Sequence, residues 1–253
     1  MRYSIFAGGK RLRPILTLAA SEACGGTVGN ALRPACAVEI MHTYSLVHDD
    51  LPCMDDDDLR RGRPTAHIVY GEANAVLIGD ALLTLAFEWA AQSPQPARIV
   101  LELAQAAGHA GMVGGQVADL AAEQAEPNAE TLDYIHRHKA GKLLTAALRM
   151  GAIAGNASNE QLDALTAFGE HLGLAFQIVD DILDETADEA VLGKPVGSDQ
   201  EQGKMTYPAL LGLDASKQLA QEHQDKALAA LDRPDLHSDR LRELLHFVIE
   251  RSF

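Results

Sequence analysis

Apolar residues recur every three to four positions along almost the whole chain, a period that is typical of amphipathic helices. Alternating stretches of β-branched residues, which would predict strands, are nearly absent, and aromatic residues make up only 5% of the sequence. We therefore expect an all-α fold. The expected helices cover residues 14–24, 31–50, 72–91, 96–121, 129–154, 159–187, 205–212, 215–231 and 238–251.

Turn-forming residues stand at the joints between these helices, for example Gly25-Gly26, Ser93-Pro94 and the glycine-rich stretch 193–203. The sequence has no Ser/Gly linker, no low-complexity tract and no clear internal repeat. We therefore expect one domain that spans residues 1–253.

The charge balance is strongly acidic, with 21 Lys and Arg against 36 Asp and Glu, for a net charge of −15. This argues against nucleic acid as a partner, since phosphate binding needs a basic patch, and it suits a protein that collects divalent cations. We expect no membrane span and no signal peptide. Cys24, Cys36 and Cys53 lack zinc-site spacing and are odd in number, so free thiols in the cytoplasm are expected.

Two stretches stand out because they carry little charge before they reach a burst of aspartates. Residues 35–47 contain only Glu39 as a charged residue, and residues 172–179 contain none. Helices of this kind are buried on most sides. Their aspartates are therefore expected at the rim of a core rather than on an ordinary wet face.

The second aspartate cluster is Gln177, Asp180, Asp181 and Asp184, spaced i, i+3, i+4 and i+7. These positions share one helix face, and like charges on one face need a cation or solvent. Carboxylate oxygens suit Mg²⁺, which often bridges carboxylates to a substrate phosphate.

The first cluster runs from His48 to Asp58. His42, Ser45 and Asp49 are aligned on one helix face, Pro52 stops the helix, and Asp55 is expected to fold back beside Asp49. A solvated acidic surface is a poor alternative for two such clusters. A calcium loop is also a poor alternative, because the regular D-x-D-x-D-G spacing and the closing Glu are missing.

Cations recur beside glycines and beside both clusters, where they would cover phosphate oxygens that a metal leaves exposed. The cations are Lys10, Arg11, Arg13, Arg60, Arg61, Arg63, Lys139, Lys142, Lys194 and Lys204.

Four segments, residues 8–14, 48–65, 176–184 and 203–212, resemble the bacterial-type farnesyl and geranylgeranyl diphosphate synthases in sequence and in order. The resemblance implies an isoprenoid synthase helical bundle around a central cavity, and usually a homodimer. It also implies three Mg²⁺ ions per active site.

The resemblance further implies residue roles. Asp49, Asp55, Asp180 and Asp184 should be metal ligands, with Asp50 and Asp181 in support. Arg60 should hold the allylic diphosphate, and Lys10, Arg13, His42 and Arg61 should hold isopentenyl diphosphate. The remaining catalytic and binding residues that it implies are Lys139, Gln177, Lys194 and Lys204.

The chain departs from this pattern twice. The family usually has some thirty residues before the GGK motif, whereas Gly8 here follows only seven residues, so an N-terminal helix is expected to be missing. The family also usually has Thr after the lysine at 139, where this chain has Ala140.

The expected reaction joins isopentenyl diphosphate head to tail to dimethylallyl or geranyl diphosphate through an allylic cation. Proton loss is assigned to the departing pyrophosphate, and His48 is interpreted as structural. Tyr44 and Ser45, on the helix turn before Asp49, should limit the tail cavity, with farnesyl diphosphate as the product. The alternatives are a geranylgeranyl diphosphate synthase, a terpene cyclase, a non-catalytic subunit of a heteromeric synthase and a generic cation-binding helical protein.

Overall fold

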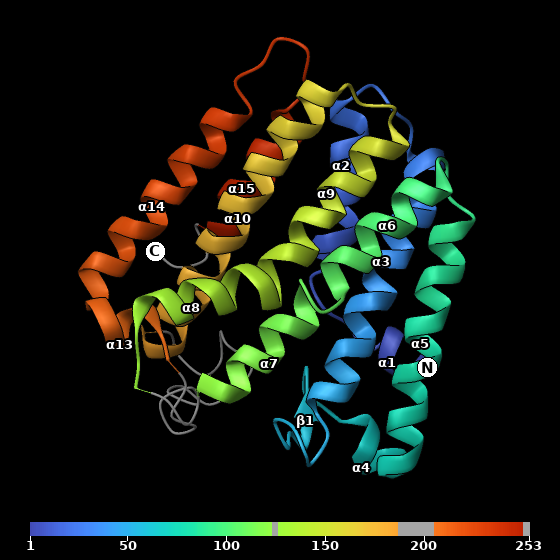
Figure 1. Cartoon of the computed structure of the whole chain (residues 1–253), viewed down its shortest axis with the longest axis vertical. Helices are drawn as coiled ribbons and strands as arrows, with labels where there is room; N and C mark the ends of the chain where they lie inside the picture. The colour runs from blue at the N-terminus through green and yellow to red at the C-terminus, as the bar shows by residue number, and fades with distance from the viewer. Residues whose placement is uncertain (123–125, 187–204, 250–253) are drawn as a thin grey trace.

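A bundle of helices dominates the computed structural model of the chain, which describes residues 1–122, 126–186 and 205–249 (Figure 1). The helices are α1 Arg2–Ile5, α2 Leu12–Ala23, α3 Val28–Asp49, α4 Ala66–Tyr70, α5 Glu72–Ala91, α6 Pro96–Ala107, α7 Met112–Ala122, α8 Ala129–Ile135, α9 Lys142–Ala154, α10 Asn159–Thr186, α13 Tyr207–Leu211, α14 Leu213–Ala230 and α15 Asp239–Ile249, with a π-helix, η1, at His136–Gly141. The expected all-α fold class is confirmed.

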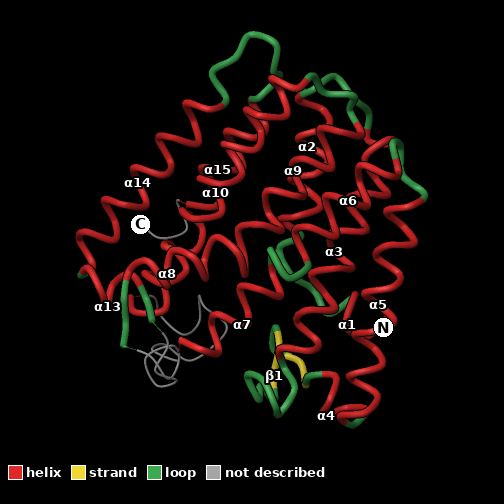
Figure 2. Tube along the Cα trace, viewed as in Figure 1, coloured by secondary structure: helices red, strands yellow, loops and turns green. Residues whose placement is uncertain are grey.

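Strands among the described residues are confined to one small hairpin, in which β1 Leu59–Arg60 pairs antiparallel with β2 Arg63–Pro64 (Figure 2). The turn places Arg61 and Gly62 at positive φ, 55° and 71°. Sequence periodicity did not predict this hairpin, because two-residue strands leave no alternating pattern.

Helix α3 lies at the centre of the bundle, against α2, α5 and α9, while α10 packs against α9 and α14. Side chains cap the N-termini of α3 and α10. The Thr27 hydroxyl accepts a hydrogen bond from Asn30 N at 3.3 Å. Ahead of α10, Ser158 and Gln161 form a reciprocal capping box, in which each side chain accepts from the other's backbone N–H.

Both central helices run towards the same end of the bundle, the lower end in Figure 1, where the hairpin and α7 also lie. One continuous core, with fully buried Leu16, Met41, Leu148 and Phe168, packs them in place. The two aspartate clusters therefore come to one end of a rigid scaffold. The expectation of one domain over residues 1–253 stays a prediction.

Two of the expected helices are subdivided in the structure. The helix expected at 96–121 is two helices, α6 and α7, separated by Gly108 and Gly111. The helix expected at 129–154 is divided by η1, which carries Lys139. The expectation of free thiols is confirmed for all three cysteines.

Helix α5 bears on the expectation that the chain has no membrane span. Within the part of the chain that the structure describes, it is the one helix long and apolar enough to cross a membrane, by length and composition only. The charged residues of this helix are Glu72, Asp80 and Glu88, and they break its apolar stretch less than we expected from the sequence. Such a helix is weak evidence for a span, because core helices pass the same test.

Candidate active site

The first aspartate cluster forms where α3 ends at Asp49. The chain turns after Pro52, and Asp55 N donates a hydrogen bond to Asp49 O at 2.8 Å. This turn brings Asp55 back beside Asp49, as the spacing predicted. Burial, with the Asp55 and Asp50 charges in addition, raises the pKa of Asp49 to about 6, although Lys139 opposes the shift.

A cavity of about 790 Å³ opens beside this turn. It is bounded by α3, α5, α7, η1 and α10, which are far apart in sequence. Its wall includes ten of the residues that the sequence singled out: Arg13, His42, Tyr44, Ser45, Asp49, Asp55, Arg60, Lys139, Gln177 and Asp180.

The second cluster divides between two surroundings. Gln177 and Asp180 line the cavity. Asp181 accepts a hydrogen bond from Tyr207 N at 3.0 Å and lies 3.8 Å from His136 Nε2. Asp184 is buried as well, only 4% exposed. The cavity wall does not include these two aspartates, and their metal-binding and supporting roles stay predictions.

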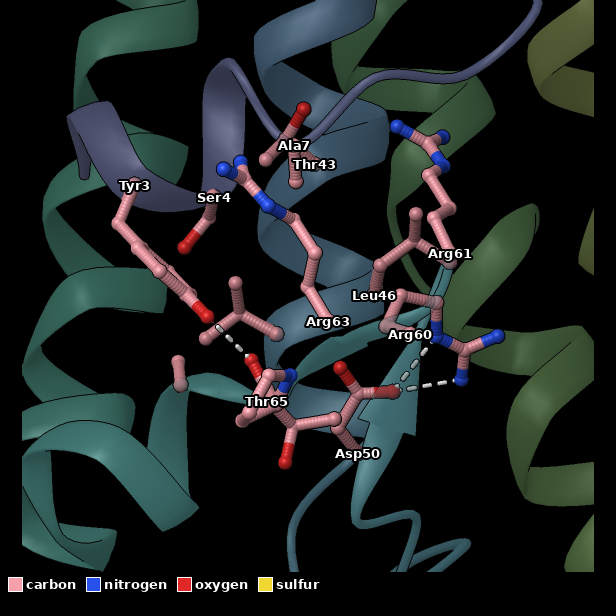
Figure 3. A pocket seen from close by; sticks show the side chains of 13 residues that line it. Tyr3, Ser4, Ala7, Thr43, Leu46, Asp50, Arg60, Arg61, Arg63 and Thr65 are labelled. Carbon is pink, nitrogen blue, oxygen red and sulfur yellow. Dashed lines mark hydrogen bonds and ion pairs between the residues drawn. The ribbon is translucent and has the colours of Figure 1, made fainter.

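Asp50 also turns away from the cavity, towards the hairpin (Figure 3). Arg60 Nε and Nη2 donate to Asp50 Oδ1 at 2.8 and 2.5 Å, and Nη2 also donates to Asp57 at 2.9 Å. Burial lowers the pKa of Arg60, but the charge and hydrogen bond of Asp50 outweigh it, so the pKa is raised. Asp50 therefore fixes the guanidinium of Arg60 at the mouth of the cavity.

A second group of cations lies at the start of α2. Arg13 is half-buried, desolvation lowers its pKa to about 10, and its buried Nε has no hydrogen-bond partner among the described residues. Burial, together with Arg13 and Arg61, lowers the pKa of His42 well below its ordinary value. A positive site with an unsatisfied donor is suited to an anion.

Arg61 and Lys10 lie outside the cavity wall. Arg61 extends towards the N-terminal segment and donates to Gly8 O (Figure 3), and both side chains are exposed. Lys194 and Lys204 lie outside the described residues. The roles of these four residues stay predictions.

The comparisons decide the family. Residues 1–246 match the polyprenyl synthetase family. The chain belongs to this family.

Named relatives and solved structures agree. The farnesyl diphosphate synthase of Escherichia coli is 47% identical over 263 residues, covering 100% of this chain and 88% of that protein. Geranylgeranyl pyrophosphate synthase 4 of Arabidopsis thaliana is 47% identical, covering 100% of this chain and 70% of that protein. A structure of a Helicobacter pylori geranyltransferase complexed with magnesium and isoprenyl diphosphate superposes with a TM-score of 0.86 at 38% identity, covering 98% of this chain and 85% of that protein.

The structure adds a partner of Lys139 that sequence reasoning missed. Lys139 Nζ donates to Asp119 on α7 at 2.5 Å. Burial lowers the pKa of Lys139, but Asp119, with Asp49 and Asp55 in addition, outweighs it and raises the pKa. The sequence signal was the segment 114–119, in which two glycines and Gln116 precede Asp119 on one helical turn.

Gly115 allows this pairing in the synthetase. A Cβ at position 115 would overlap the backbone N and Cα of Lys139, so α7 and η1 touch through their main chains. The π-helix itself widens the turn that carries Lys139 and Ala140. Ala140 lines the cavity, so the hydroxyl that the family usually has here is absent from the wall.

Glu39 is a second missed residue. It is the single charged residue of the central part of α3 and is 8% exposed. Arg11, which adopts φ 53° at the start of α2, donates to Glu39 Oε1 at 2.5 Å and to Ile5 O at 2.5 Å. This pair ties the basic turn to α3 and so sets the position of Arg13.

Apolar side chains complete the lining of the synthetase site. Besides the charged residues, the wall includes Val76 on α5, Met112, Val113 and Val117 on α7, and Phe176 on α10. A cavity lined by both charged and apolar side chains suits a ligand that has a diphosphate head and a hydrocarbon tail.

Proposed function

We propose that this synthetase condenses isopentenyl diphosphate head to tail with dimethylallyl or geranyl diphosphate, and that farnesyl diphosphate is its product. The observation that carries the proposal is the pair of separate cation groups at one cavity. Arg60 and Lys139 lie beside the aspartates, whereas Arg13, near the start of α2, and the neighbouring imidazole of His42, on α3, make up the second group. Two diphosphates need two such groups.

The donor set fits magnesium. Asp49, Asp55 and Asp180 present carboxylate oxygens to one cavity. The raised pKa of Asp49 marks a burial cost that a bound cation would offset. No three His, Cys, Asp or Glu side chains of the described residues converge closely enough to hold a metal by themselves, so water and diphosphate oxygens would have to complete the coordination of a bound ion. Three ions per site are part of the proposal, and they would supply neutralisation of the leaving diphosphate.

The chain's own residues then divide the work. Arg60, Lys139 and Gln177 orient the allylic diphosphate from three different elements, and Lys194 and Lys204 are proposed to complete this group. Lys10, Arg13, His42 and Arg61 orient isopentenyl diphosphate so that its alkene faces the allylic carbon. Gln177 also presents an amide dipole towards the developing cation.

The proposed reaction needs no side-chain base. The allylic C–O bond breaks and leaves a cation, and the alkene of isopentenyl diphosphate attacks it to form the new C–C bond. The proton lost next goes to the departing pyrophosphate. The apolar side chains of the wall keep water from the cation during these steps.

Tyr44 is proposed to set the product length. It lines the cavity, is 7% exposed, and lies five residues before Asp49 on α3. Ser45, on the same turn, is small and leaves the bulk of the floor to Tyr44. A twenty-carbon product is the second candidate, because the relatives include geranylgeranyl synthases as well as farnesyl synthases.

A homodimer is proposed as the assembly, and the cytoplasm as its location. Helix α5 presents Val76 and Leu77, which are 40% and 63% exposed, and the neighbouring α4 presents Ile68, Val69 and Tyr70. A second copy would cover this apolar surface. The effect of a missing N-terminal helix on the dimer stays a prediction.

An elongation assay tests the proposal. Purified protein, Mg²⁺, labelled isopentenyl diphosphate and geranyl diphosphate should give a labelled linear fifteen-carbon diphosphate, and chelation of Mg²⁺ should abolish it. Asp49→Asn should lose activity. Asp232→Asn makes the same change at a surface aspartate, so it is the matched control and should keep activity. Cyclised hydrocarbon would indicate a cyclase, and a folded protein that makes no product would support the non-catalytic subunit.

A further inference from the structure

His48 stands directly before Asp49 on α3, yet the proposed reaction gives it no role. Its ring lines the same cavity as Tyr44, one helical turn away. His48 Nε2 lies 3.0 Å from Val76 O on α5, so the tautomer with a proton on Nε2 donates across the interface between the two helices. Asp80, on the next turn of α5, lies 4.0 Å from the same nitrogen.

Gly79 makes the room for this ring. A Cβ at position 79 would overlap three ring atoms of His48, Nε2, Cδ2 and Cε1. The imidazole therefore occupies a notch that the missing side chain of α5 leaves open. Its position is fixed by shape as well as by the hydrogen bond to Val76 O.

The same ring contacts Tyr44. The ring centroids of Tyr44 and His48 are 5.7 Å apart, and the planes meet at 89°, an edge-on contact. His48 thus touches both the Tyr44 ring and the backbone of α5. Val76 lines the cavity on the α5 side, and His48, one turn nearer Asp49 than Tyr44, supports the Tyr44 ring from the side of the aspartates.

We propose that His48, seated in the Gly79 notch, is a positioning residue that holds Tyr44 across the tail end of the cavity and thereby sets product length. The inference rests on the proposed condensation. One prenyl unit is about as long as one helical turn, ~5.4 Å. Loss of the His48 side chain, which lets the Tyr44 ring move, is therefore enough to make room for one further prenyl unit.

The test compares product lengths for four variants in the elongation assay. His48→Ala removes the support, so the ratio of twenty-carbon to fifteen-carbon product should rise roughly tenfold, as expected when an apolar pocket gains a small group's volume. Tyr44→Ala should shift the ratio in the same direction. His48→Phe keeps a ring in the notch and should restore the fifteen-carbon product. His109→Ala, at an exposed histidine away from the cavity, should match the parent.

Gly79→Ala provides an independent route to the same result. The added methyl group expels the imidazole from the notch while His48 itself is kept, so the product ratio should shift as it does for His48→Ala. Gly29→Ala is the matched control, because a Cβ there meets only Thr27 Oγ1, at 3.8 Å.

The outcomes separate the inference from the proposed function. If the parent elongates and all His48 and Gly79 variants keep its product ratio, the positioning role is wrong and the condensation stands. If His48→Phe shifts the ratio as far as His48→Ala, ring volume is not what holds Tyr44, and the inference is also overturned. If the parent does not elongate, the proposed function fails first. Circular dichroism of each variant confirms that it is folded.

Discussion

At the scale of single residues, two carboxylates near the cavity serve to place cations. Asp50 holds Arg60, and Asp119 holds Lys139, at distances of 2.5 Å in both pairs. Each pair is partly buried, where a charged hydrogen bond is stronger than at the surface. Loss of either carboxylate charge should therefore be felt at the cavity rather than only in stability.

Asp119→Asn tests this directly. The amide keeps the size of the side chain but removes the charge, so Lys139 is drawn to Asp49 and Asp55 instead. We expect kcat/KM for the allylic substrate to fall roughly tenfold or more, equivalent to at least about 1.4 kcal/mol. The KM for isopentenyl diphosphate should not change, and the Mg²⁺ concentration for half-maximal rate should rise. A variant that lowers only the melting temperature would show a structural role instead.

Buried histidines predict how stability depends on pH. Burial lowers the pKa of His136 to about 4, below the ordinary 6.5. Burial and the neighbouring His171, whose Nδ1 lies 3.0 Å away, do the same for His223. As pH falls from 6.5 towards 4, the unfolded chain gains protons that the folded chain does not, so the free energy of unfolding decreases.

The corresponding measurement is urea unfolding of the parent and of His136→Gln at pH 7.5, 6 and 5. The free energy of unfolding of the parent should decrease as the pH falls. His136 contributes at most about 3 kcal/mol to this decrease, once the pH has reached its folded-state pKa. The variant should lose less, and His109→Gln should follow the parent. Asp49, with its raised pKa, changes stability in the opposite sense, but it is present in all three proteins, so the difference between them isolates His136. Equal slopes for all three proteins would contradict the account.

At the scale of elements, the sequence predicted the long helices well because each has an apolar face of regular period. Helix α5 has the predicted bounds, and α10 starts at the predicted residue. The predictions failed where backbone packing decides the structure. The break at Gly108 to Gly111 separates α6 from α7, and the π-helix η1 depends on contact with α7.

The site shows the same division. Asp49, Asp180 and the cations were recognisable because their spacing and residue type are unusual. The surroundings of Asp181 were not, because the sequence places it on the face of Asp180, while Tyr207, 26 residues later, draws it elsewhere. Asp119 and Glu39 were missed because a lone carboxylate on a helix is usually a surface charge.

Gly115→Ala tests the contact between α7 and η1. The added methyl group meets backbone atoms of Lys139, which do not move as a side chain does. We expect a loss of about 2 kcal/mol, typical of over-packing, or roughly 4–8 °C in Tm for a chain of this size. Activity at a temperature where the protein is folded should also fall, because η1 carries Lys139. Gly29→Ala should leave both unchanged, and an unaffected Gly115→Ala protein would rule out the tight contact.

At the scale of the whole molecule, the exposed apolar surface of α4 and α5 is where we propose that a second copy binds. A second copy and a membrane are the two partners that such a surface suits. Leu77→Lys places a charge at its most exposed point. Analytical ultracentrifugation should show a dimer for the parent and a monomer for the variant, while Phe247→Lys, at an exposed residue of α15, should remain dimeric.

Parent protein that sediments as a monomer and floats with lipid vesicles would contradict the dimer. It would assign α5 to a membrane instead. A parent monomer that ignores vesicles would leave the apolar surface without either partner and would also contradict the proposal.

The central claim is that one cavity holds two diphosphates on separate sets of cations. Isothermal titration calorimetry in the presence of Mg²⁺, with isopentenyl diphosphate and a non-ionisable allylic thiodiphosphate, measures this most directly. The account predicts one site for each ligand per chain, filled together. Arg13→Ala should weaken isopentenyl diphosphate and spare the allylic analogue, and Arg60→Ala should do the reverse. Mutual displacement of the two ligands, or equal weakening of both by Arg13→Ala, would contradict it.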